Sequence, residues 1–377
     1  MKGNAAGMRE NARIVVKIGT NLITDRLAGL NIERINALTR GVSHLRAAGH
    51  GVVVVSSGAI GAGLAARRLT ERPRSMPEKQ ATAAIGQPIL MEAYEAAFRA
   101  HALMVAQILL TREDFADRRR YLNARNTISV LLENGAVPVI NENDTVAVDE
   151  IRLGDNDTLS AMVANLIGAD LLVILSDIDG FYTDDPSRNP QAEFVPVVDA
   201  ITPKIERQAR KTGGESGTGG MATKIQAAKR CTSAGIAMII ANGGNPLILQ
   251  EIASGAYRGT LFLPFADRLS VKKKWIAFVS LPKGSVRIDA GAEAALVVHR
   301  KSLLPSGILD VTGEFAEKDT ITVLGPGGDE IARGLCGFSS ADLVKIKGKK
   351  TTDVGKILGR RSRGEVIHKD QLVLLGR

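Results

Sequence analysis

The chain has 377 residues, of which 45% are hydrophobic and 24% are charged. These values are ordinary for a globular protein, and the length suits two or three domains. The longest apolar runs span about eight residues, too few for a membrane-spanning helix, and residues 1–13 lack the apolar segment of a signal peptide. The two cysteines and the five histidines stand apart from one another, which disfavours a disulfide framework, zinc hydrolysis and a histidine-activated nucleophile. We expect a cytoplasmic protein.

The net charge of +9 lies mostly in the last third of the chain. Residues 271–377 hold 19 Lys and Arg against 12 Asp and Glu, whereas residues 1–270 hold 30 against 28. This shift in composition indicates a boundary near Pro264–Lys274. We predict an N-terminal domain over residues 1–266, a linker over about 267–274 and a basic C-terminal domain over 275–377.

Short aliphatic stretches alternate with segments of helical periodicity over the first 263 residues. The predicted strands are 13–18, 52–55, 103–109, 137–140, 171–175 and 237–241, and the predicted helices include 32–48, 91–101, 121–133 and 159–166. This alternation predicts an α/β fold, an α/β/α sandwich with a mainly parallel sheet. Ligands of such sheets bind beyond the carboxyl ends of the strands.

The first two of these strand ends carry unusual residues. Lys17 ends the first strand, where an ammonium group is costly to bury unless it meets an anion; the alternative is a lysine whose charge reaches the sheet edge. Ser57 follows the second strand within a run of small residues, SSGAIGAG, that lets a ligand approach the backbone. It is not the nucleophile of a GxSxG turn, because position 55 is Val.

Polar residues also follow the next two strands. Asn141–Asp144 and then Gly154–Asp157 place amides and carboxylates at one strand end and at a helix start. Asp155 or Asn156 suits a helix N-cap, and the remainder suit recognition of an amino or carboxyl group. Ser176 and Asp177 end the fifth strand, where a nucleotide could be held or where they are ordinary loop residues.

The segment GGESGTGGMATK, residues 213–224, contains five glycines and leads into a helical pattern. Glycine-rich backbone, a helix N-terminus and Lys224 together suit phosphate binding, although the spacing is not that of a P-loop. A flexible surface loop is the alternative. With Lys17 on another element and carboxylates nearby, the combination favours phosphoryl transfer. An acidic acceptor needs no general base, and Mg²⁺ is expected mainly on the nucleotide phosphates, with no protein ligand assigned.

The motifs VVKIGTNLI, VSSGAIGAG, INENDTVA, LGDNDTLSA, LSDIDGFYTDDP and GTGGMATKIQAA occur in this order. Together they resemble the glutamate 5-kinase family of the amino acid kinase superfamily, over essentially the whole chain. Many relatives have TSGA where this chain has SSGA. GTGGM-TK alone is shared with other kinases of the superfamily, whereas the combination of SGAI, NEND and GDND is far more specific.

The resemblance implies ATP-dependent phosphorylation of the L-glutamate side chain to L-glutamyl 5-phosphate, the first step of proline biosynthesis. By motif, Lys17 and Lys224 would stabilise the transferring phosphate, and Asp157 would orient them. Glutamate would be held by Ser57, Asp144, Asn156 and Asn141. ATP would be held by Lys17, Ser176, Asp177, Thr218, Gly219, Gly220, Met221, Ala222, Thr223 and Lys224. The resemblance also implies a homo-oligomer and a handover of the labile product to glutamyl phosphate reductase.

The C-terminal part contains β-like stretches at 285–288, 308–311 and 320–324, which suggest a small β-barrel, and its order resembles a PUA domain, an RNA-binding fold. Residues 345–363 are strongly basic, but Phe338 is the only aromatic residue nearby for base stacking. A solvated face or a subunit contact is the favoured interpretation of this strip. Two alternatives to a glutamate kinase remain open: a sister kinase with another acidic acceptor, and an RNA-binding protein acting through this tail.

Overall fold

The computed structural model describes residues 9–25, 29–71, 73–146, 155–211, 220–264, 276, 282–360 and 364–375. The chain forms two compact units, Met1–Asp267 and Arg268–Arg377, which are described separately. Each has its own hydrophobic core: one cluster runs from Ala12 to Leu261 and the other from Val286 to Leu372. Within the described residues, no helix is long and apolar enough to cross a membrane.

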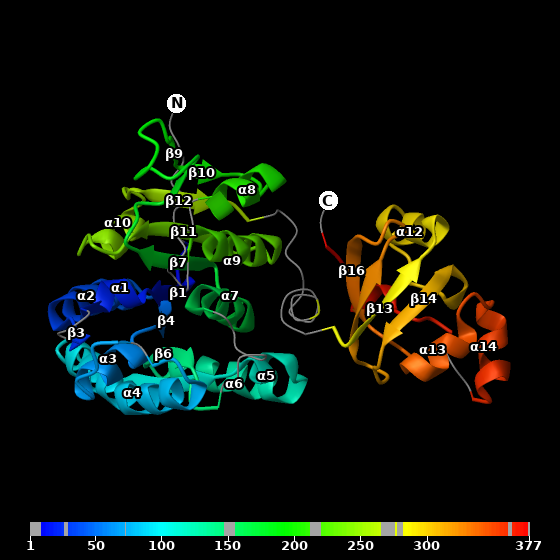
Figure 1. Ribbon diagram of the computed structural model, residues 1–377, viewed down its shortest axis with the longest axis horizontal. Coiled ribbons are helices and arrows are strands. Elements are labelled where there is room, and N and C mark those ends of the chain that lie inside the picture. Colours follow the sequence, from blue (N-terminus) through cyan, green and yellow to red (C-terminus); the bar gives the residue numbers. More distant parts are fainter. Residues whose placement is uncertain are drawn as a thin grey trace. The chain divides into compact units, whose positions relative to one another are not determined.

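The larger unit is built on an eight-stranded sheet, whose strands are stacked one above another in Figure 1. In spatial order they are β10 (Val197–Val198), β12 (Gly259–Phe262), β11 (Ala237–Asn242), β7 (Leu171–Ser176), β1 (Arg13–Ile18), β4 (Gly51–Ser56), β6 (Val137–Glu142) and β5 (Val105–Leu110). All neighbours are parallel except β11 and β12. The six predicted strands are therefore confirmed, and β10 and β12 were missed.

Helices cover both faces of this sheet. Helices α2 (Ile32–Ala47), α4 (Met76–Arg99) and α10 (Ile248–Ser254) share one core with Ile14, Val16 and Ile18 of β1. On the other face, α7 (Asn156–Ile167) packs on β1 and β7, α9 (Met221–Ser233) on β11, and α6 (Arg118–Glu133) on β6. Because side chains alternate along a strand, Lys17 of β1 points to the α7 face. The predicted α/β/α sandwich is confirmed.

The remaining elements of the larger unit are short. They are α1 (Thr20–Ile23), α3 (Ala59–Ala66), α5 (Arg112–Ala116), α8 (Pro203–Lys211), and two hairpins, β2 (Thr24–Asp25) with β3 (Gly29–Leu30) and β8 (Phe181–Tyr182) with β9 (Phe194–Val195).

Glycine sets the distance between α3 and α4. A Cβ atom on Gly86 would lie 1.8 Å from the Ala59 carbonyl oxygen, and one on Gly63 would lie 2.0 Å from the Thr82 carbonyl oxygen. The two helices therefore touch backbone to backbone, which holds the first turn of α3 directly against the middle of α4.

The smaller unit contains a mixed five-stranded sheet. Its order is β14 (Ile308–Gly313), β13 (Gly284–Ile288), β15 (Thr320–Leu324), β16 (Glu330–Leu335) and β17 (Leu372–Leu374). Helices α12 (Ala290–Val297), α13 (Ser340–Ile346) and α14 (Thr351–Leu358) and the 3₁₀ turns Pro305–Gly307 and Lys369–Gln371 complete it. The three β-like stretches predicted here are confirmed as β13, β14 and β15.

We predict that Gly86→Ala destabilises the protein by roughly 1–3 kcal/mol or more, because the added methyl group overpacks the α3–α4 contact. The measurement is the urea unfolding midpoint of the purified variant. Gly51→Ala is the control, since its Cβ atom would come no closer than 3.8 Å to Arg13 and meets only ordinary van der Waals contacts. Equal stability of both variants would contradict the packing argument.

Candidate active site

Two buried lysines from different elements share one carboxylate. Lys17 of β1 places Nζ 2.6 Å from Oδ1 of Asp157, and Lys224 of α9 places Nζ 3.2 Å from its Oδ2. The exposed fractions are 7% for Lys17, 4% for Lys224 and 0% for Asp157. Thr223 also donates to Asp157 Oδ2, at 2.9 Å. These three side chains carry two positive charges and one negative charge, and the Asp155 and Asp177 carboxylates also interact with Lys17 and Lys224.

The start of α7 positions this carboxylate. Asp155 is the N-cap, and its side chain accepts a hydrogen bond from the Thr158 amide at 2.7 Å, as the N-cap alternative predicted. Asp157 lies in the first turn, where the helix dipole also favours a negative charge. Burial raises the pKa of Asp155, and the negative charge of Asp157 adds to that increase. Burial acts in the same direction on Asp157, but the Lys17 and Lys224 ammonium groups outweigh it and hold the pKa of Asp157 below its ordinary value.

Three side-chain amides connect the β4, β6 and α4 elements at this edge of the sheet. Asn156 Nδ2 donates to Ser57 Oγ at 2.8 Å, to the Ser56 carbonyl at 3.1 Å and to Asn141 Oδ1 at 3.1 Å. Asn141 Nδ2 in turn donates to Gln87 Oε1 at 2.9 Å. Behind them, the hydroxyls of Ser56 and Tyr94 are 2.7 Å apart. This network fixes residues that are far apart in the sequence.

Gly58 begins α3 next to Ser57 and has φ of 114°, in the left-handed region that glycine tolerates best. A Cβ atom there would also lie 3.1 Å from Ile23 Cδ1. The left-handed conformation of Gly58 therefore makes the sharp turn from β4 into α3, and residues Ser57 to Gly61 line one cavity.

The end of β7 and the start of α9 lie across from the Asn156–Asn141–Gln87 network, on the other side of the site. Ser176 Oγ donates to Asp177 Oδ1 at 3.0 Å, and Asn21 Nδ2 approaches Asp177 Oδ2 at 3.3 Å. Burial raises the pKa of Asp177, but the hydrogen bonds from Asn21 and Ser176 outweigh this and lower it overall. Gly220 is the N-cap of α9, and no side chain of the described residues caps the first amides of this helix, which suits an anion there.

These groups surround one cavity of about 410 Å³. The predicted site residues that line it are Lys17, Ser57, Asn141, Asp144, Asn156, Ser176, Asp177 and Lys224. Asp157 and Thr223 are connected to these residues through the Lys17–Asp157–Lys224 ion cluster. Gly220 precedes the first turn of α9, in which Met221 is buried and Ala222 is half-buried. Thr218 and Gly219 lie outside the described residues.

Other lining residues were not predicted as site residues. Glu142 belongs to the polar run Asn141–Asp144 but was not chosen from it, and Asn21 follows the end of β1, so the strand-end rule could have found both. Pro73 precedes α4 and Lys79 lies in its first turn. Nothing in the local sequence distinguishes either from a surface residue. Gln87, in the middle of α4, does not line the cavity but bonds to Asn141, and nothing in the local sequence indicates this role. Among the described residues, no group of three or more His, Cys, Asp or Glu could hold a metal ion.

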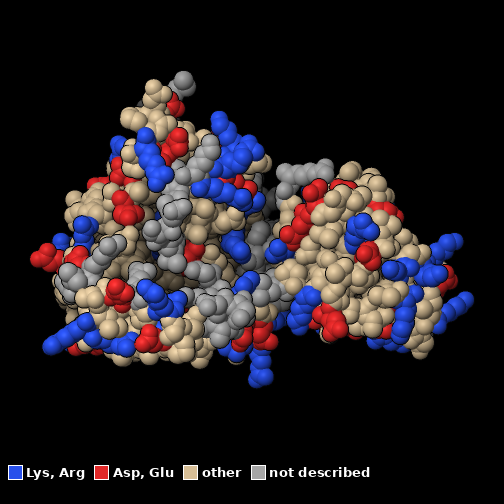
Figure 2. All heavy atoms as spheres, viewed as in Figure 1, with Lys and Arg blue, Asp and Glu red and all other residues tan. Residues whose placement is uncertain are grey.

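The basic segment of the smaller unit is partly neutralised. Arg360 pairs with Asp342 at 2.7 Å and Lys347 with Asp310 at 3.7 Å. Figure 2 shows acidic side chains interspersed among Lys and Arg on the visible face of this unit. Phe338 is 2% exposed, so it belongs to the core and cannot stack on a base. These observations favour a solvated face over a nucleic-acid surface.

The sandwich and the paired lysines define a phosphotransferase of the amino acid kinase class. The model of the amino acid kinase family matches residues 12–242, and that of the PUA domain matches residues 284–358. Glutamate 5-kinase of Caldanaerobacter subterraneus subsp. tengcongensis is 50% identical over 97% of this chain and 98% of its own length. Glutamate 5-kinase of Geobacter sp. strain M21 is 49% identical over 98% and 99%. The chain belongs to the glutamate 5-kinase family.

The chain is also similar to solved structures. UMP kinase from Ureaplasma parvum has 17% sequence identity and a TM-score of 0.49, covering 68% of this chain and all of its own.

We predict that Asp157→Asn lowers the free energy of unfolding at pH 7 by about 3 kcal/mol, because two buried ammonium groups lose their counterion. The folded-state pKa of Asp157 is depressed, so its contribution is present above the unfolded value of about 3.9 and is lost as pH falls through the folded value. The difference between variant and wild type should therefore shrink below about pH 4. Urea unfolding at pH 7 and pH 3.5 measures it, with exposed Asp199→Asn as the control. A difference independent of pH would contradict the assignment.

Proposed function

We propose that this protein transfers the γ-phosphoryl group of ATP to the side-chain carboxylate of L-glutamate, giving L-glutamyl 5-phosphate, the first step of proline biosynthesis. The observation that carries the proposal is the Lys17–Asp157–Lys224 clamp, which lies between a polar pocket at the β4 and β6 ends and a helix N-terminus beside β7. The relatives named glutamate 5-kinase support the choice of acceptor.

In this mechanism the glutamate carboxylate is the nucleophile. It is ionised at neutral pH, so the site needs no general base. Lys17 and Lys224 contribute fixed positive charge where negative charge develops on the transferring phosphoryl group, and Asp157 keeps both ammonium groups in place. Because these charges are already buried and oriented, little reorganisation accompanies the reaction.

The two sides of the cavity divide the substrates between them. Ser57, Asn141, Asp144 and Asn156 would hold glutamate, with amide and carboxylate oxygens suited to its ammonium group and the first amides of α3 suited to a carboxylate. Ser176, Asp177, Lys224 and the segment from Thr218 into α9 would hold ATP. The α9 amides suit its phosphates, as in other helix N-termini that bind anions.

Mg²⁺ fits this site as part of the nucleotide. The described residues hold no three-ligand cluster, and Mg²⁺ in kinases is bound largely through phosphates and water. When bound, it would neutralise phosphate charge. We also propose that residues 1–266 form the catalytic domain and residues 275–377 a PUA-like domain, which is supported by their separate cores.

Hydroxylamine trapping of the acyl phosphate tests the proposed function. Purified protein with ATP and Mg²⁺ should give a hydroxamate with L-glutamate and none without an acceptor. Aspartate, N-acetylglutamate and carbamate form the comparison panel. Signal with another acid and not with glutamate would indicate a sister kinase, and no signal with any acceptor would overturn the kinase proposal.

We predict that Lys224→Ala lowers kcat by at least about 100-fold and changes the KM for ATP by less than about threefold, because the ammonium group acts mainly in the transition state. Lys229→Ala is the matched control: it lies on the same helix, but its side chain is 56% exposed and pairs with Glu206. Steady-state kinetics with both substrates measure the effect. A change confined to the KM for ATP would refute this role for Lys224.

A further inference from the structure

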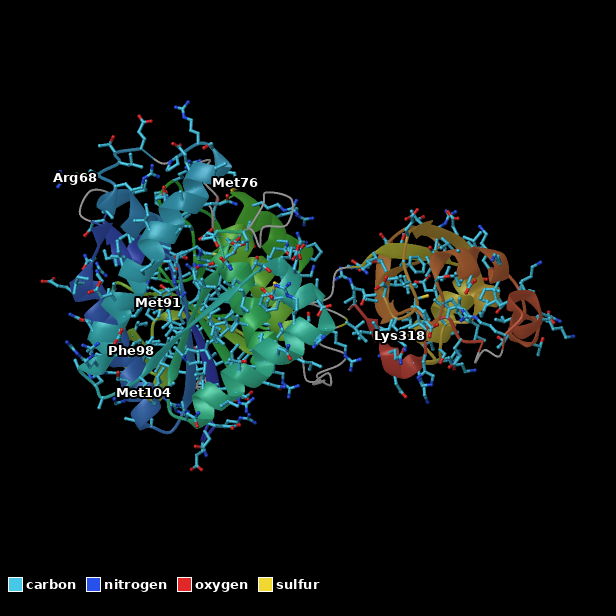
Figure 3. The ribbon with its side chains drawn as sticks, turned by 90° about the horizontal axis from the view of Figure 1, so that it is seen from below. Arg68, Met76, Met91, Phe98, Met104 and Lys318 are labelled. Carbon is cyan, nitrogen blue, oxygen red and sulfur yellow. The ribbon has the colours of Figure 1, made fainter. Side chains whose placement is uncertain are left out.

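Gln87 lies in α4, the long helix that runs from Met76 past Met91 to Phe98 in Figure 3. It is only 8% exposed, and it is not among the residues that line the cavity. Its single hydrogen bond among the described residues is the one that its Oε1 accepts from Asn141 Nδ2 at 2.9 Å, and its Nε2 is buried without a partner. Gln87 is thus a buried polar residue whose described contact leads to the acceptor pocket.

The hydrogen bonds that connect Asn156, Asn141 and Gln87, the amide chain, can run in only one donor-to-acceptor direction. The Ser56 carbonyl can only accept, so the group 3.1 Å away from it must be the Asn156 NH₂. That NH₂ also donates to Asn141 at 3.1 Å, which makes the facing atom of Asn141 its oxygen. The Asn141 NH₂ must then point to Gln87, where it meets an oxygen. The chain is anchored at one end by the backbone of β4 and at the other by Gln87.

This direction determines which atoms face the cavity. Asn141 and Asn156 both line it, and their NH₂ groups are turned inward to protein acceptors. The Asn141 oxygen accepts from Asn156 and keeps a second lone pair, so the carbonyl oxygens of both residues can still accept from a bound donor, next to Glu142 and Asp144 on the same wall. This wall is electronegative and suits a cation. An NH₂ group of Asn141 turned to the cavity would instead repel one.

We propose that Gln87 is a positioning residue for recognition of the acceptor's amino group. It holds the Asn141 amide so that oxygen, and not NH₂, faces the substrate ammonium. This inference rests on the proposed function. Without the Gln87 oxygen, the NH₂ group of Asn141, a residue that is 4% exposed, loses its acceptor. Among the described contacts, the hydrogen bond from Asn156 to the Asn141 oxygen then holds the amide alone against a rotation that turns the NH₂ group toward the cavity.

Gln87→Met keeps the length of the side chain and removes the acceptor. We expect the KM for glutamate to rise roughly five- to tenfold, the scale of one lost neutral hydrogen bond, with the KM for ATP unchanged. Glutarate has both carboxylates and no amino group, so its inhibition constant against glutamate should change by less than about twofold. The preference for the amino-bearing ligand should therefore fall.

Three comparisons separate positioning from a general structural role. Gln87→Glu retains an oxygen toward Asn141 and should restore much of the preference for glutamate. In an Asn141→Ala background, Gln87→Met should add little, because its effect passes through Asn141. Gln107→Met, at an exposed position of β5, is the matched control and should change neither ligand.

Equal weakening of glutamate and glutarate would overturn the inference, as would full additivity of Gln87→Met with Asn141→Ala. The hydroxylamine assay on the wild-type protein distinguishes a failure of the proposed function from a failure of the positioning role. If wild type forms no hydroxamate with glutamate, the proposed function fails; if wild type is active and Gln87→Met binds glutamate normally, the positioning role alone fails.

Discussion

The larger unit depends on one buried ion cluster. Asp157 has no exposed surface, and it lies within ion-pairing distance of two ammonium groups that are themselves almost fully buried. Burying three charges is unfavourable unless they compensate one another, and two against one leaves an excess positive charge. Asp155 and Asp177 line the same cavity and interact with Lys17 and Lys224, so the charge balance of the site includes these carboxylates as well. In the proposed function, the two ammonium groups and the start of α9 together receive the phosphate.

The sheet topology explains why these groups meet. β4, β1 and β7 are adjacent and parallel, so their carboxyl ends open at one edge, and α7 and α9 begin at that edge. Close packing adds a second constraint. The backbone contact through Gly63 and Gly86 holds α3 against α4, so the first turn of α3 is packed against the helix that carries Gln87.

Much of this arrangement could be predicted from the sequence, for identifiable reasons. The central strands are continuous aliphatic runs. The rule that ligands bind at the carboxyl ends of parallel strands selects Lys17, Ser57, Asn141 and Asp177 from the sequence. It could not find β10 or β12, which have two and four residues and no clear periodicity. Gln87 was missed because a glutamine within a helix looks like a surface residue; only the fold turns it toward β6.

The alternation of side chains in β1 has a consequence for folding. Ile14, Val16 and Ile18 enter the apolar core shared with α2 and α4, whereas Lys17 meets Asp157 on the opposite face. A shift of β1 by one residue would place Lys17 in the apolar core and would remove one of the two lysines that pair with Asp157. The Lys17 ammonium group therefore also disfavours misaligned pairings of the central strand, and the residue proposed to stabilise the transferring phosphoryl group helps to specify the register of the sheet.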